Sequence, residues 1–204
     1  YIMIGKKYNI PHIKIEDIEY VGIKVPVFSF NRLPNVDPIL GVEMASTGEV
    51  ACFGYDVKET YLKALISSGL KMPKKNILVS IGNDTSKFEF LGSLDLLKNM
   101  NYDIYSTTGT HSFFENNGLS TNLVDMERIF DMIKNNEIDL LINIPQNIYS
   151  SNNSTNGFKM RRMCLDYNIP VITNIKCGKL FVSSLKEFEK NGLEFRSWNE
   201  YVLE

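Results

Sequence analysis

The sequence lacks the features that mark disulfide frameworks, zinc sites and membrane spans. Its 204 residues include only three cysteines, and these are widely spaced without any C-x-x-C pair: Cys52, Cys164 and Cys177. Scattered cysteines in odd number indicate neither disulfides nor a zinc site and favour a reducing compartment. No apolar run approaches the roughly 20 residues that cross a bilayer, and the first residues do not read as a secretory signal. We therefore expect no membrane partner.

The sequence also lacks an excess of basic charge. The formal net charge is -2, and no run of lysine or arginine is longer than a pair. Domains that bind nucleic acid usually carry a basic patch, so we expect no nucleic-acid partner. Hydrophobic residues make up 44% and charged residues 23%, close to the averages of soluble globular proteins. The length suits one domain with an appendage, or two small domains.

The first part of the chain has few helix signals. Alternating apolar residues from Tyr20 to Phe30 predict a half-buried strand, and Pro26 within it indicates a sheet edge. Residues 31–38 contain two prolines, which predict turns. A helix is expected to begin at Asp56 and to end at Gly69, followed by a linker over residues 70–75. We therefore divide the chain into residues 1–75, 76–190 and a tail, 191–204.

Beyond the linker, short apolar strands alternate with amphipathic helices. This order is typical of a parallel sheet covered by helices on both faces, and nearly continuous apolar strands suit a buried sheet. The expected strands are residues 76–81, 103–106, 122–124, 139–144 and 170–173. We predict an α/β, Rossmann-like domain with a five-stranded parallel sheet, preceded by a mixed α+β tail.

Polar loops follow several of these strands, where ligands of open α/β sheets bind. The run Ser106-Thr107-Thr108-Gly109-Thr110 leads into a helix, so hydroxyls and the positive helix end are expected to converge on an anion. Lys87 is a candidate for the balancing charge. The alternative is that Thr107 and Thr110 only cap the helix, and both interpretations stay open at this point.

Four further polar residues have a structural and a functional interpretation. Asn143, at a strand end, is a candidate for orienting a ligand, although such asparagines more often satisfy local backbone groups. His111 reads as a surface residue in a helix's first turn, because no carboxylate is placed to orient it. For Arg161 and Arg162 we favour a solvated side chain or a simple salt bridge for at least one of the two.

Longer motifs resemble a known family. The stretch Leu33 to Val50, reading LPNVDPILGVEMASTGEV, is similar to the end of the second ATP-grasp half of carbamoyl-phosphate synthetase. Residues 73–78, the threonine–glycine loop, and Arg161-Arg162 ahead of residues 168–170 resemble that family's methylglyoxal-synthase-like regulatory domain. The resemblance covers about residues 20 to 190. It implies that residues 1–75 are the tail of the ATP-grasp half and that residues 76–190 are the regulatory domain.

The resemblance implies a parent enzyme that makes carbamoyl phosphate from bicarbonate, two ATP and glutamine-derived or free ammonia, for pyrimidine or arginine synthesis. ATP, Mg or Mn, and K would bind upstream, so we expect no cofactor, no metal and no catalytic residue in this segment. Expected partners are the upstream synthetase domains and a glutaminase domain or subunit. Because the chain begins with Tyr1, we expect a cut or processed end, and we place the protein in the cytoplasm or, alternatively, the mitochondrial matrix.

The family's effector pocket implies six effector-binding residues: Ser80, Lys87, Thr107, Thr110, Asn143 and Gln146. Asn156 lies near a further effector-binding asparagine. Met126 departs from the family, because bacterial relatives have a second phosphate-binding lysine there and urea-cycle relatives a tryptophan nearby. UMP or UTP is our first choice of effector. N-acetylglutamate and a structural or oligomerisation domain without ligand are the alternatives.

Methylglyoxal synthase itself is the enzymatic alternative. That enzyme needs a Gly-Gly-Asp acid after the third strand, where this chain reads Asp125-Met126-Glu127-Arg128, and Gln146 replaces another of its aspartates. Without a base for proton abstraction next to a carbonyl, we set this interpretation last.

Overall fold

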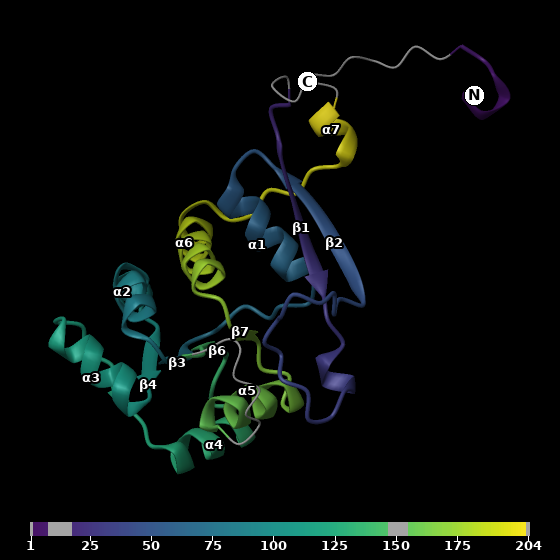
Figure 1. Ribbon diagram of the computed structural model, residues 1–204. Helices are drawn as coiled ribbons and strands as arrows, with labels where there is room; N and C mark the ends of the chain where they lie inside the picture. The colour runs from purple at the N-terminus through teal and green to yellow at the C-terminus, as the bar shows by residue number, and fades with distance from the viewer. Residues whose placement is uncertain (1, 8–17, 147–154, 203–204) are drawn as a thin grey trace.

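A parallel sheet of five strands forms the centre of the molecule (Figure 1). The computed structural model describes residues 2–7, 18–146 and 155–202. The strand order is β5-β4-β3-β6-β7, and each pair is parallel. The bounds are β3 (Asn76–Ile81), β4 (Asp103–Ser106), β5 (Asn122–Leu123), β6 (Leu140–Ile144) and β7 (Val171–Ile172). The predicted α/β architecture is confirmed.

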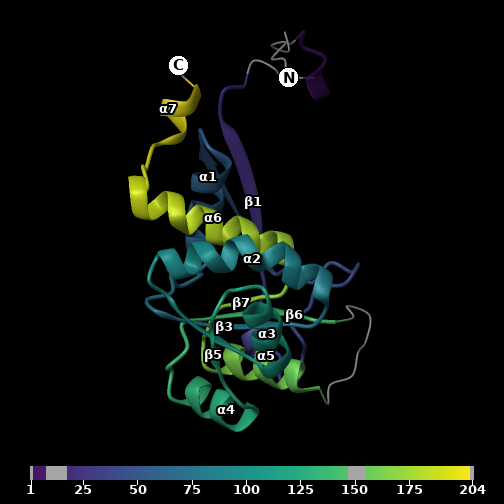
Figure 2. The same cartoon turned by 90° about the vertical axis from the view of Figure 1, so that its left-hand side faces the viewer.

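Helices cover both faces of this sheet, as Figure 2 shows. One layer contains α2 (Asp84–Asn99) and α6 (Ile175–Asn191), and the other contains α4 (Met126–Lys134) and α5 (Asn156–Asp166). Successive strand residues point to opposite faces, so Ile77 and Val79 pack under α2 and α6 while Leu78 packs against α4 and α5. Helix α3 (Thr108–Asn116) buries Phe114 in the first layer.

The two edge strands are shorter than the sequence indicates. The expected strands at residues 122–124 and 170–173 reduce to two residues each. Each edge strand pairs with one neighbour only, β4 or β6. Pro170 lacks an N–H, and its carbonyl accepts from Leu141 N at 2.9 Å just before β7 begins. The pairing of β5 with β4 and of β7 with β6 extends over two residue pairs each, which limits the length of both edge strands.

A two-stranded antiparallel sheet precedes the central sheet. It consists of β1 (Val21–Val27) and β2 (Gly48–Gly54), and Pro26 lies on a strand with one partner, as predicted. Asp56 caps the start of helix α1 (Val57–Ser67), because its carboxylate accepts from Lys58 N and Glu59 N. Leu62 of α1 packs in the same core as Phe181 and Leu185 of α6. The two-stranded sheet is therefore attached to the central one through α1, and the division at residue 75 stays a prediction.

Residues 30–38, here called the anchored segment, lie against α5. They include the short helix η3 (Phe30–Arg32). Arg162 donates from Nη1 to the carbonyl oxygens of Phe30, Leu33 and Val36, at 3.0, 2.8 and 3.3 Å. Arg161 and Arg162 are only 4% and 8% exposed. The expectation of a solvated arginine is therefore wrong, whereas the expected salt bridge is present in the pairs Arg161–Asp37 and Arg162–Asp166. Together the two arginines supply donors to a segment that lies 124 to 132 residues earlier in the chain.

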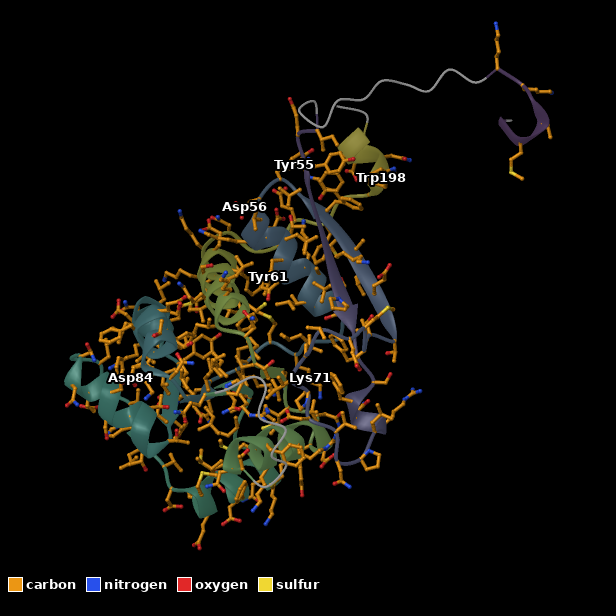
Figure 3. All side chains as sticks on the ribbon, in the orientation of Figure 1. Tyr55, Asp56, Tyr61, Lys71, Asp84 and Trp198 are labelled. Carbon is orange, nitrogen blue, oxygen red and sulfur yellow. The ribbon has the colours of Figure 1, made fainter. Side chains whose placement is uncertain are left out.

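A short helix near residue 200 packs against the two-stranded sheet. Helix α7 (Trp198–Val202) places Tyr201 Oη 3.1 Å from the carbonyl oxygen of Phe53, and the Trp198 ring centroid lies 4.7 Å from that of Phe53. Figure 3 shows Trp198 beside Tyr55 at this end of the molecule. The remaining short helix is η1 (Ile2–Ile4). Within the described residues, every helix is too short or too polar to cross a membrane.

The fold makes a prediction about cysteine reactivity. Cys164 is fully buried, and burial raises the pKa of its thiol to about 12, so it stays protonated and unreactive at neutral pH. Cys177 is exposed in the first turn of α6. Iodoacetamide followed by mass spectrometry should label Cys177 in the native protein and Cys164 only after unfolding. Equal labelling rates in the native state would contradict the packing of α5.

A second prediction concerns the anchored segment. Arg162→Ala removes the donor shared by three carbonyls and leaves Asp166 without its arginine, so the free energy of unfolding should fall by about 3 kcal/mol. Arg128→Ala is the matched control: its guanidinium is 53% exposed and pairs with Glu137, so it should cost less than about 1 kcal/mol. Urea unfolding measures both. Similar losses in the two variants would show that Arg162 does not anchor the segment.

Candidate functional site

A cleft of about 800 Å³ opens at the carboxyl ends of the central strands. The chain runs from β3 outward to β4 and β5 and then returns to β6 on the other side of β3. Such a reversal is the place where open α/β sheets bind ligands. Residues from β3, β6, the start of α3 and the start of α5 line the cleft, and Ile39 joins them from just beyond the anchored segment.

The floor of the cleft is set by strand register. Ser80 of β3 lies opposite Asn143 of β6, and Asn143 Nδ2 donates to the carbonyl oxygen of Ser80 at 3.1 Å. Just beyond this pair, Gly82 N donates to the carbonyl oxygen of Ile144 at 2.8 Å. A Cβ on Gly82 would lie 2.4 Å from Gln146 N, so only glycine permits this close approach of the two loops. Asn143 thus satisfies a local backbone group and also lines the cleft, and its role in orienting a ligand stays a prediction.

The threonine loop does not cap its helix through a side chain. Thr107 occupies the position before α3, yet its hydroxyl makes no capping hydrogen bond. Its Oγ1 lies 3.3 Å from both Ser80 Oγ and Thr110 Oγ1. Thr110 is 2% exposed, and its Oγ1 accepts from Ile81 N at 2.9 Å. Thr107 thus directs its hydroxyl to the cleft, whereas Thr110 lies behind it and ties α3 to β3.

Lys87 does not line the cleft. Its Nζ lies 2.9 Å from Asp84 Oδ1 and 5.4 Å from the centroid of the Phe113 ring, and the residue is 8% exposed. Figure 3 labels its partner Asp84 near the start of α2. The expected role of Lys87 as the balancing charge does not match this placement, because a lysine three residues after an aspartate on a helix faces that aspartate.

Arg161 is the single charged side chain among the described residues that line the cleft. It lies on α5, and its Nη1 donates to Asn143 Oδ1. Sequence reasoning assigned it no site role, because neither its burial nor its distant partner Asp37 can be read from the neighbouring residues. Met126 and Asn156 also line the cleft, together with Thr155 and Gly157. Asn147, which the sequence placed beside Gln146, lies outside the described residues.

The chemistry of these residues favours binding over catalysis. The described lining offers hydroxyls, amides and one guanidinium but no carboxylate. No group of three or more His, Cys, Asp or Glu among the described residues is placed to hold a metal ion, so the cleft does not fit Mg or Mn. His111 is partly buried, and its Nδ1 lies 2.9 Å from Thr121 Oγ1. The lining suits the oxygen atoms of an anionic ligand.

Comparisons with known proteins show which family the chain resembles. The model of the family described as "MGS-like domain" matches residues 89–173. The chain is 45% identical over 194 residues to "Multifunctional protein pyr1-3" of Dictyostelium discoideum, covering 90% of this chain and 9% of that protein. It is 42% identical over 185 residues to "Multifunctional protein CAD" of Squalus acanthias, covering 81% of this chain and 8% of that protein.

A third relative is the human "Carbamoyl-phosphate synthase (ammonia), mitochondrial", 34% identical over 204 residues, with 93% of this chain and 13% of that protein covered. A solved structure, methylglyoxal synthase from Elizabethkingia anophelis, covers 66% of this chain and 97% of its own, at a TM-score of 0.42 and 14% identity, a likeness too remote to carry an argument. The chain thus spans about a tenth of the length of the curated relatives it matches. It therefore carries an MGS-like domain and is homologous, over most of its length, to the corresponding region of carbamoyl-phosphate synthetases.

Proposed function

We propose that this chain is the effector-binding regulatory segment of a carbamoyl-phosphate synthetase and that it binds an anionic regulator in the cleft between β3 and β6. The observation that carries the proposal is the Thr107 hydroxyl at the start of α3. It makes no helix-capping hydrogen bond and lines the cleft together with Ser80 and Asn143. Hydroxyls, amides and a helix N-terminus together suit phosphate or carboxylate oxygens.

The proposed contacts differ from the expectation in two residues. Ser80, Thr107, Asn143 and Gln146 line the cleft and are the proposed direct contacts. Thr110 supports Thr107 from behind, and Lys87 is engaged by Asp84. The segment would have no turnover of its own, since its described lining lacks a general base. ATP, Mg or Mn, and K would be used elsewhere in the parent enzyme.

A pyrimidine nucleotide, UMP or UTP, is the first candidate for the regulator. Identity is higher to the multifunctional proteins, 45% and 42%, than to the human ammonia-type synthase, 34%. Met126 lines the cleft without a charge, so Arg161 is the one cation that the described lining would offer to a phosphate, beside its hydroxyls, its amides and the start of α3. N-acetylglutamate is the second candidate, because the amides of Asn143 and Gln146 are suited to its acetamido group.

Calorimetric titration of the chain with UMP tests the proposal. We expect saturable binding, and Thr107→Ala should weaken it about tenfold, since a hydrogen bond to a charged group contributes about 1.5 kcal/mol. Thr85→Ala, an exposed threonine of α2 outside the cleft lining, should leave the affinity unchanged. Binding of N-acetylglutamate but not UMP would replace the nucleotide with the second candidate. Absence of binding to UMP, UTP and N-acetylglutamate would overturn the effector role.

A further inference from the structure

Arg161 connects the cleft to the anchored segment. Its Nε donates to Asp37 Oδ1 at 2.7 Å, and its Nη2 donates to Asp37 Oδ2, while Nη1 donates to Asn143 Oδ1. Asp37 belongs to the anchored segment, 124 residues earlier in the chain. The guanidinium therefore has a carboxylate on one side and a cleft amide on the other.

The guanidinium lies at the wall of the cleft, behind Gly157. A Cβ on Gly157 would lie 3.1 Å from Arg161 Nη1 and 3.6 Å from Asn143 Oδ1, and Gly157 itself lines the cleft. The backbone of Gly157 therefore packs closely against the contact between Arg161 and Asn143. Because glycine has no side chain, none stands between this contact and the cleft.

The contact of the Asp37 carboxylate with Arg161 is of the same kind that an anionic ligand would make. A planar guanidinium binds carboxylates and phosphates in the same two-pronged manner. Arg161 is 4% exposed, so little water is present to solvate a second anion beside the first. Two like charges that share one buried partner disfavour each other. Ligand binding at Arg161 and the Asp37 contact therefore oppose each other.

We propose that Arg161 is an anion-binding residue of the cleft and that the Asp37 carboxylate is its internal competitor, so that an anionic effector weakens the attachment of the anchored segment. This inference rests on the proposed function of the cleft. The opposition is reciprocal: attachment of Asp37 lowers effector affinity by the same factor by which the effector lowers attachment. Arg162, which bonds three carbonyls of the segment, keeps the rest of it against α5 and confines the change to the Asp37 end.

Asp37→Asn tests the competition. This variant removes the competing charge, so the dissociation constant for UMP should fall about tenfold, equivalent to about 1.4 kcal/mol. Asp166→Asn is the matched control, because it removes the same charge from the neighbouring Arg162, which does not line the cleft; its affinity should equal that of the wild type. An unchanged or weaker affinity in Asp37→Asn, with UMP still bound by the wild type, overturns the competition alone. Failure of all three proteins to bind UMP, UTP or N-acetylglutamate would overturn the proposed function and this inference with it.

Hydrogen exchange of the wild-type protein gives an answer that needs no variant. Saturating UMP should raise the exchange rate of the Ile39 amide, which donates to Asp37 Oδ1. The Arg32 and Leu33 amides, in the part of the segment that Arg162 holds, should keep their rates, and the His111 amide in the first turn of α3 should be protected. Slower exchange at Ile39 would show cooperation instead of competition.

Discussion

The parallel pairing of β3 with β6 is the constraint on which the rest of the structure depends. These strands occupy the middle of the sheet, and their alternating side chains provide both cores. The same register sets Ser80 beside Asn143 and brings Gly82 against the chain after β6. Core and cleft are thus two consequences of one ladder, and a one-residue slip would exchange the buried faces and separate the site residues.

The cleft is polar but nearly free of charge among its described residues. A binding site of this kind discriminates through oriented donors more than through long-range attraction, and its single cation is already paired with Asp37. Phosphate affinity then depends on the helix start and on hydroxyl geometry.

Local patterns of the sequence were sufficient to predict much of the fold. Apolar runs at residues 76–81 and 139–144 identified the two central strands, and Asp56 identified the start of α1, because each signal is local. The lengths of the two edge strands were overestimated, because the length over which a strand pairs with its neighbour is set by the tertiary structure. The threonine loop was recognised as a candidate, but whether Thr107 caps α3 depended on Ser80, which lies 27 residues away.

The arginine pair shows where local reasoning fails. Nothing near Arg161 and Arg162 in the sequence reveals their hydrogen-bond partners. These are Asp37 and three backbone carbonyls, which lie more than 120 residues earlier. For Lys87, the sequence reasoning considered the charge without Asp84, the aspartate one helical turn before it. In both cases the position of the charge was known and its partner was not.

The aromatic contacts of α7 have a consequence for the order of folding. Tyr201 and Phe53 meet across 148 residues of intervening chain, so their contact closes a very long loop. Loop closure of that size costs conformational entropy before any contact repays it, unless the intervening sheet has already folded and shortened the distance. The two-stranded sheet, although it precedes the central sheet in this sequence, therefore gains its contacts with α7 after the central sheet has folded.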